Sequence, residues 1–289
     1  MRRSGAVAEA RGFGPGDHLC WVFDTHEDFR VRAVEFLAEG LDAGERCWYL
    51  GSSDVAALRT DLQELGPVDE LVGCDALRLV PIEAGYGPDP AQTVLGWARA
   101  VEDALVAGHS GLRVVTDCTA VARSAELFHE FARYEMLIDG YYAAGAPLCG
   151  MCGFHRPQVG PQRLDELCSL HPSVNLAAAQ PFRLHAANPD WALPGIPPAL
   201  VAVAGEIDLS CVEGFARCLD RSGLFAGGGE MVLDAAELIF IDHRGLVVLD
   251  EFARARGGTV VLRDGPYQAG RIVEILELQQ VQVEAGSSR

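Results

Sequence analysis

The sequence predicts an α/β protein built as two domains, and three observations carry this prediction. The chain has 289 residues, a length that favours two domains over a single core. Short apolar runs alternate with segments of helical periodicity through the first half, which is typical of a mainly parallel sheet with helices on both faces. Proline and small residues then concentrate near residues 156–180, and a second alternation follows them. We therefore predict a flexible N-terminus at 1–14, a first domain at 15–178, a second domain at 179–285 and a tail at 286–289.

The net charge restricts the kinds of partner. The formal charge is −18 and the chain contains no lysine. A nucleic-acid-binding surface needs a basic patch, and no sufficiently large arginine cluster is present. An acidic membrane surface would also repel the chain. Without lysine, a Schiff base, a phosphate-loop lysine and a lysine general base are all excluded.

Location and redox state follow from the apolar runs and the cysteines. No apolar run approaches the roughly 20 residues of a membrane span, and no signal peptide is recognisable at the basic N-terminus. The nine cysteines are odd in number and spread through apolar segments, which is typical of reduced, buried thiols. We expect a cytoplasmic protein.

Each strand of the first half is predicted from an apolar run, and each helix from capping residues and apolar positions at i, i+3 and i+4. The helix after Asp54, for example, ends at Gly66-Pro67. The predicted strands are 17–23, 46–50, 77–82, 112–117 and 146–154. The predicted helices are 29–42, 54–65, 91–107, 124–142 and 164–170.

Ordered motifs in this half carry a family resemblance. They are Gly16-Asp17-His18-Leu19-Cys20, Glu39-Gly40-Leu41-Asp42-Ala43-Gly44-Glu45-Arg46-Cys47-Trp48-Tyr49, Cys152-Gly153-Phe154-His155-Arg156 and His171-Pro172. Over about residues 12–178 the chain resembles the MEDS domain, a sensory module of methanogen and methylotroph regulators. The resemblance implies a RecA-like fold that senses a small, hydrocarbon-derived ligand. RecA-like ATPases carry a glycine-rich loop with a lysine after the first strand. The corresponding residues 24–28 here are acidic and contain no glycine and no lysine. We therefore predict no ATP hydrolysis.

The candidate ligand site lies at one edge of the predicted sheet, because open parallel sheets bind ligands at the carboxyl ends of their strands. The resemblance marks three candidate ligand residues, His18, Cys20 and Cys152. Positions 18 and 20 face the same way on a strand. Helix capping and core packing remain the alternative role for each residue. The other candidates, at the strand ends, are Asp24, His26, Ser52, Ser53, Asp117, Cys118, His155 and Arg156.

A zinc site is the alternative that the cysteine and histidine spacing raises. Cys149 and Cys152 lie three apart on a predicted strand, so they point to opposite faces and cannot bind one ion together. We therefore expect no metal ion and no cofactor. The residues with zinc-like spacing are Cys149, Cys152, His155, Cys168 and His171.

The second half repeats the alternation of strands and helices. Ser210 caps one helix, and Asp242 ends an apolar run before another. The predicted strands are 181–187, 200–208, 231–234, 259–263 and 281–283. The predicted helices are 210–224, 244–256 and 267–277.

Two motifs of the second half carry another resemblance. They are Gly205-Glu206-Ile207-Asp208-Leu209 and, at fixed spacing, Leu238, Phe240, Ile241, Asp242, Gly245 and Leu246. Over about 181–285 the chain resembles the STAS domain, shared by anti-sigma-factor antagonists and anion-transporter tails. The resemblance implies an α/β domain whose helices cover one side of the sheet. It also implies a partner-binding surface at Asp208, Asp242, His243, Arg244 and Gly245.

The residue before Gly245 decides how such a module is controlled. In the antagonists that position is a serine or threonine, which a switch kinase that is also the anti-sigma factor phosphorylates. Here it is Arg244, which has no hydroxyl group and carries the wrong charge to imitate a phosphate. We therefore expect a partner such as an anti-sigma factor or a switch-kinase-like protein, bound without phosphorylation at this position.

Together these features predict a non-enzymatic regulator in which a small-molecule sensor is coupled to a protein-interaction module. Three alternatives stay open: a redox sensor with a disulfide between Cys149 and Cys152, an enzyme that uses the N-terminal crevice, and a passive scaffold or homodimer.

Overall fold

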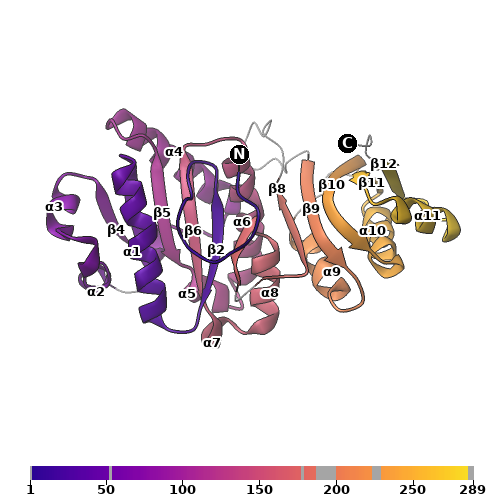
Figure 1. Ribbon diagram of the computed structural model, residues 1–289, viewed down its shortest axis with the longest axis horizontal. Coiled ribbons are helices and arrows are strands. Elements are labelled where there is room, and N and C mark those ends of the chain that lie inside the picture. The colour runs from indigo at the N-terminus through magenta and orange to yellow at the C-terminus, as the bar shows by residue number, and fades with distance from the viewer. Residues whose placement is uncertain (1, 52–53, 177–178, 187–199, 223–228, 286–289) are drawn as a thin grey trace.

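The computed structural model describes residues 2–51, 54–176, 179–186, 200–222 and 229–285. Within these residues the chain forms a seven-stranded sheet and a five-stranded sheet, which lie side by side in Figure 1. The α/β class and the division of strands between two sheets are confirmed. Among the described helices, none is both long enough and apolar enough to cross a membrane.

The first sheet is entirely parallel, with the strand order β1-β7-β2-β6-β5-β3-β4. Its strands are β1 (Gly5–Val7), β2 (His18–Phe23), β3 (Arg46–Gly51), β4 (Leu77–Pro81), β5 (Leu112–Asp117), β6 (Leu148–His155) and β7 (Ser173–Asn175). The helical segments between them are α1 (His26–Asp42), α2 (Val55–Asp61), η1 (Gln63–Leu65), α3 (Val68–Gly73), η2 (Ile82–Ala84), α4 (Pro90–Val106), α5 (Thr119–Arg123), α6 (Phe128–Ala143), α7 (Arg156–Val159) and α8 (Pro161–Ser169).

Helices cover both faces of this sheet. Alternate side chains of each buried strand therefore enter two different cores, one on each face. One core joins the sheet to α4, α6 and α8, and it contains Cys20 and Cys152. The other core joins the sheet to α1 and α2, and it contains Cys149. Cys149 and Cys152 therefore face opposite sides of β6, as their spacing predicts.

The second sheet has the order β12-β11-β10-β9-β8, and only its edge strand β8 runs antiparallel to its neighbour. One core gathers residues of this sheet with residues of its three helices. The strands are β8 (Phe182–Ala186), β9 (Leu200–Ile207), β10 (Gly229–Ile241), β11 (Gly258–Gly265) and β12 (Val281–Ala285), and the helices are α9 (Val212–Arg221), α10 (His243–Ala255) and α11 (Tyr267–Ile275).

The two halves share a packed boundary formed by α6 and α8, which lie between the first sheet and β8 (Figure 1). Ala132 and Met136 of α6 belong to the same core as the second sheet. The buried Glu166 of α8 accepts a hydrogen bond from Arg221 Nε of α9 at 2.8 Å. Apolar packing thus holds the second sheet against α6, and a partly buried ion pair holds α9 against α8.

Three strands differ from the sequence expectation: β1 and β7, which were not predicted, and β10, which is longer than predicted. Residues 5–7, in the segment that we expect to be flexible, form β1 beside β7, and Gly5 N donates to Pro172 O at 2.8 Å. The segment is held because Arg3 N donates to Asp17 Oδ1 at 2.8 Å and Arg3 O accepts from Ser173 Oγ at 3.0 Å. A three-residue strand has too few residues to show a period. In the second half, the strand expected at 231–234 extends over the whole of β10 and includes two register shifts.

Candidate functional site

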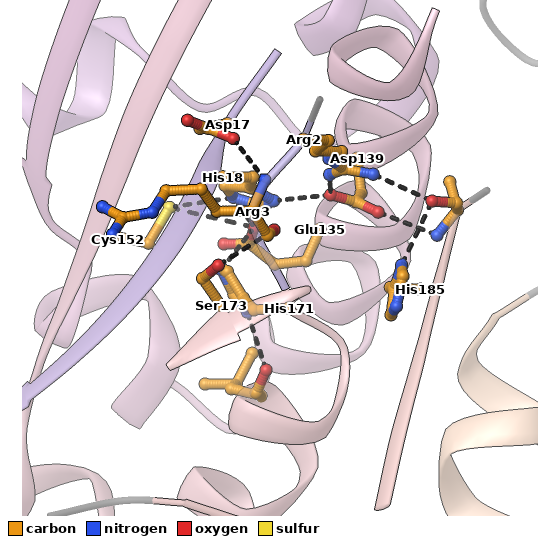
Figure 2. Close-up of polar contacts among 12 residues, drawn as sticks. Arg2, Arg3, Asp17, His18, Glu135, Asp139, Cys152, His171, Ser173 and His185 are labelled. Carbon is orange, nitrogen blue, oxygen red and sulfur yellow. Dashed lines mark hydrogen bonds and ion pairs between the residues drawn. The ribbon is translucent and has the colours of Figure 1, made fainter. Parts of the chain in front are cut away.

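The most unusual site is a buried polar cluster between β2, β6, α6 and the turn after α8. The cluster consists of His18, Glu135, Cys152 and His171, whose facing N, O and S atoms all lie within 4.8 Å of one another. Figure 2 shows these side chains converging from separate parts of the chain. All four are buried, and buried polar groups of this kind are retained only where they have partners or a function.

His18 lies at the centre of the cluster because β2 begins there and directs it toward α6. Its Nδ1 is 3.0 Å from Asp139 Oδ1. Its Nε2 is 3.4 Å from Glu135 Oε2 and 3.5 Å from Cys152 Sγ. Glu135 and Asp139 are four residues apart on α6, so they share one helix face.

His171 completes the cluster from the opposite side. Its Nδ1 is 2.7 Å from Leu167 O, which requires an Nδ1–H donor and leaves the Nε2 lone pair free. That Nε2 lies 3.5 Å from Glu135 Oε2. Among the described residues, His171 Nε2 and Glu135 Oε1 have no hydrogen-bond partner. Two buried polar atoms of one cluster are therefore unsatisfied.

The surroundings shift the pKa values of the two histidines in opposite directions. Burial, together with the neighbouring His18, lowers the pKa of His171 to about 4, so this imidazole is neutral at neutral pH. Burial would also lower the pKa of His18, but hydrogen bonds to Asp139 and Glu135 outweigh it and raise the pKa. The cluster thus holds one histidine favoured as a cation and one favoured as a neutral base.

Asp139 connects this cluster to the second sheet. Its Oδ2 accepts a hydrogen bond from Ala186 N at 2.8 Å, and its Oδ1 pairs with the Arg2 guanidinium. Arg2 Nη1 also donates to Ala186 O at 2.8 Å. Burial alone would raise the pKa of Asp139, but Arg2 and His18 hold it below its usual range. Both backbone groups of Ala186, the last residue of β8, are therefore bound by this ion pair.

A cavity lies on the other side of the cluster, at the carboxyl edge of the sheet. It measures about 440 Å³, and residues after β4 and β5 and along α6 line it. Its wall is mostly apolar and aromatic, with Val121, Phe131, Tyr86 and Tyr134 among its residues. Tyr86 also lines a neighbouring hollow of about 540 Å³ beside Trp48 and Trp97. This size and lining suit a small, mostly apolar molecule.

The cavity wall connects with the buried cluster through two thiols. Tyr86 Oη is 3.5 Å from Cys118 Sγ. The Cys118 and Cys152 side chains interact, and this interaction together with burial raises the pKa of the Cys152 thiol. Cys152 in turn contacts His18. A continuous set of contacts therefore leads from the cavity to His18, Asp139 and β8.

The candidate ligand residues predicted from the sequence lie in separate places in the structure. Asp24, His26, Asp117, His155 and Arg156 gather at the exposed edge of the sheet, where His155 Nε2 is 3.1 Å from Asp24 O, Arg156 Nε donates to Asp24 Oδ1 at 3.0 Å, and His26 Nδ1 is 3.9 Å from Asp117 Oδ2. His18, Cys118 and Cys152 belong to the buried contacts instead. Ser52 and Ser53 lie outside the described residues.

The zinc-like spacing does not correspond to one site in the structure. Cys149 faces the opposite side of the sheet, and His155 lies at the exposed edge. Cys168 Sγ lies 3.6 Å from Cys20 Sγ. Only Cys152 and His171 of that set meet, and they meet His18 and Glu135. The opposite orientation of Cys149 and Cys152 also separates the two sulfurs that the redox alternative requires.

Five residues of the cluster, its surroundings and the cavity wall were not predicted as site residues from the sequence: Glu135, Asp139, Arg2, Tyr86 and Tyr134. One signal was present: Glu135 and Asp139 are carboxylates four residues apart within a helix whose neighbouring positions are mostly apolar. A charged pair on a buried helix face needs partners.

The expected partner surface in the second half centres on the start of α10. Asp242 caps this helix by accepting hydrogen bonds from Arg244 N at 2.8 Å and Gly245 N at 3.0 Å. It also pairs with Arg244 Nη1 at 3.2 Å. This ion pair offsets the unfavourable interaction between the arginine cation and the positive end of the helix dipole. A Cβ on Gly245 would lie 2.7 Å from Ile241 Cγ1, so the helix approaches β10 too closely for a side chain here.

Exposed groups surround this helix start. His243 and Arg244 are exposed, and Asp208, in the turn after β9, accepts hydrogen bonds from Ser210 N and Oγ at 2.8 and 2.6 Å. Leu209, Ile239 and Phe240 are large apolar side chains that remain exposed near the ends of β9 and β10. Apolar groups beside charged ones are typical of protein-interaction surfaces.

Comparison with known proteins concerns the part of the chain that contains the first of these sites. A search of the curated proteins found no match. A family model described as the MEthanogen/methylotroph, DcmR Sensory domain matches residues 17–172. The match spans more than half of the chain and includes the buried cluster and the cavity wall, and the chain therefore belongs to the MEDS family of sensory domains.

Proposed function

We propose that this chain is a non-enzymatic signalling protein in which the MEDS part binds a small, mostly apolar ligand and a STAS-type part binds a protein partner. The observation that carries the proposal is the 440 Å³ cavity, which is connected to the buried cluster through Tyr86 and Cys118. A sensing role follows from the family. The ligand class follows from the aromatic lining.

Coupling between the two parts is supported by the contacts on either side of His18. A ligand that moves Tyr86 acts on Cys118 and Cys152, and through His18 on Asp139, which binds the edge strand β8. Such a relay changes the conformation of the second part only if two arrangements of these contacts exist and the ligand binds them with different affinity.

The STAS-type assignment is supported by a mixed sheet with α10 starting beside Asp242, and by the close approach at Gly245. The partner that fits the proposal is an anti-sigma factor or a switch-kinase-like protein. Arg244 removes the hydroxyl group that such a kinase would phosphorylate, so ligand binding in the first part takes over the control.

Filling the cavity tests the ligand proposal. We expect Val121→Phe to weaken binding of toluene, used as a probe, by at least about tenfold, because the added ring occupies the space between α5 and α6. Saturation-transfer NMR with toluene and 1-butanol measures the binding. Val106→Phe adds the same ring at an exposed position of α4 and serves as the control. Unchanged binding in Val121→Phe, or no binding by the unaltered chain, would contradict the proposal.

A charge placed on the exposed apolar surface tests the partner proposal. We expect Ile239→Asp to weaken capture of the partner by about tenfold or more, as is usual for a central apolar contact. The intact chain serves as bait in a lysate of its own organism, and captured proteins are identified by mass spectrometry. Ile275→Asp is the matched control, because Ile239 and Ile275 are both 71% exposed but Ile275 lies on α11.

The identity of the captured protein decides the outcome. The proposal requires an anti-sigma factor or a kinase-like ATPase that Ile239→Asp loses and Ile275→Asp retains. Incubation with that protein and ATP should add no phosphate to residues 238–250. Equal loss in both variants, or a phosphate mapped to this segment, would contradict the assignment.

A further inference from the structure

We propose that His18, Glu135, Cys152 and His171 bind one divalent transition-metal ion, of the class of Zn²⁺ or Fe²⁺. This site goes beyond the ligand cavity and the partner surface, and it stands or falls independently of both. It also revises the expectation, drawn from spacing alone, that the chain holds no metal.

The distances between donor atoms fit a tetrahedral ion. Donors at about 2.0–2.3 Å from such an ion lie about 3.3–3.8 Å from one another. In the cluster, Glu135 Oε2 is 3.4 Å from His18 Nε2, 3.5 Å from His171 Nε2 and 3.9 Å from Cys152 Sγ. Cys152 Sγ is 3.5 Å from His18 Nε2. Four of the six donor–donor distances thus lie at or close to the values that a tetrahedral ion requires, and all six are within 4.8 Å.

Both histidines are oriented as metal ligands. A ligating imidazole usually donates its second N–H to a carboxylate or a carbonyl group, which directs the other nitrogen at the ion. His18 has Asp139 Oδ1 at 3.0 Å from its Nδ1, and His171 has Leu167 O at 2.7 Å from its Nδ1. Both Nε2 atoms therefore face the centre of the cluster.

The unsatisfied atoms are a second, independent sign. Within the described part of the chain, His171 Nε2 and Glu135 Oε1 are buried without a hydrogen bond. An unpaired buried polar group destabilises the folded state. A metal ion bound to His171 Nε2 and Glu135 Oε2 removes this penalty for the histidine nitrogen and holds the carboxylate at the centre of the cluster.

Charge and ligand type indicate which ions fit. The Cys152 thiolate and the Glu135 carboxylate together balance a 2+ ion, and the two imidazoles bind in their neutral form. On binding, the thiol proton of Cys152 and any Nε2 proton of His18 leave to solvent as the metal–sulfur and metal–nitrogen bonds form. Imidazole and thiolate ligands favour Zn²⁺, Fe²⁺ or Co²⁺ over Mg²⁺ and Ca²⁺, which prefer oxygen.

Elemental analysis tests the site. The full chain is produced in medium with added zinc or iron and analysed by plasma mass spectrometry, and we expect about one transition-metal ion per chain. Refolding with Co²⁺ should also give the absorption of a cobalt–thiolate bond. We expect Cys152→Ser and His171→Ala to reduce the bound metal at least about fivefold, since each removes one of the ligands on which affinity depends.

The matched control is Cys149→Ser, a buried cysteine on the same strand that faces the other core. It should retain the metal and the cobalt–thiolate absorption. Circular dichroism and gel filtration confirm that each variant is folded, and Glu135→Gln provides a nearly isosteric fourth variant. The proposal fails if the folded, unaltered chain holds no metal both as purified and after refolding with Zn²⁺ or Co²⁺. It fails equally if the Cys152→Ser and Cys149→Ser variants bind the same amount of metal per chain.

Discussion

Replacing Arg113 by methionine is expected to lower the free energy of unfolding by about 3–5 kcal/mol, the usual effect of removing one partner of a buried ion pair. Arg113 is only 2% exposed and lies on the face of the sheet that α1 covers. Its Nε donates to the buried Glu45 at 2.5 Å, and its Nη1 and Nη2 donate to the carbonyl groups of Phe36 at 3.2 Å and Phe13 at 2.8 Å. Methionine fills a similar volume but leaves one charge and two carbonyl groups unpaired.

Guanidinium unfolding followed by circular dichroism measures this effect. Arg78→Met is the matched control, because Arg78 pairs with Asp75 on the surface and is 43% exposed. An exposed pair of this kind contributes about 0–1 kcal/mol. A second change, Glu45→Gln, should recover part of the loss in Arg113→Met by removing the unpaired charge. A loss below about 1 kcal/mol in Arg113→Met would show that the buried pair is not a main support of this core.

Much of the fold could be predicted because the strands of a doubly covered parallel sheet are continuous apolar runs. The runs at β2, β3, β5 and β6 are separated by helices whose caps are visible in the sequence, such as Thr25 before α1. β7 was missed because Ser173–Asn175 is short and polar at both ends. Its position depends on neighbours that are distant in the sequence, which a local pattern does not contain.

The candidate site was predicted only in part, for a related reason. His18, Cys152 and His171 belong to the motifs of the resemblance, so they could be named as individual residues. Their meeting place depends on how α6 packs on β2, and Glu135 on that helix supplies the contact between the two histidines. The spacing of Cys149 and Cys152 correctly excluded their joint site, but it contained no information about His18 at the other end of the chain.

Asp139→Asn is expected to weaken the attachment of the second sheet more than any exposed carboxylate does. The aspartate is buried and joins Arg2, His18 Nδ1 and Ala186 N. An asparagine of the same shape keeps at most part of these hydrogen bonds and leaves the Arg2 charge unpaired, a loss of about 3 kcal/mol or more. We expect hydrogen exchange at residues 182–186 to accelerate at least about tenfold, because β8 loses its link to α6.

Hydrogen-exchange mass spectrometry and guanidinium unfolding measure these changes, with Glu130→Gln on the exposed side of the same helix as the control. Because the pKa of Asp139 is held below its usual range, its contribution is complete above pH of about 4 and is lost as the pH falls further. The difference between Asp139→Asn and the unaltered chain should therefore shrink in acid. It should also shrink as the pH rises through the raised pKa of His18, because the protonated form of His18 pairs with Asp139. If β8 exchanges equally fast in Asp139→Asn and Glu130→Gln, Asp139 does not connect the two sheets, and the proposed relay from the cavity through His18 is contradicted.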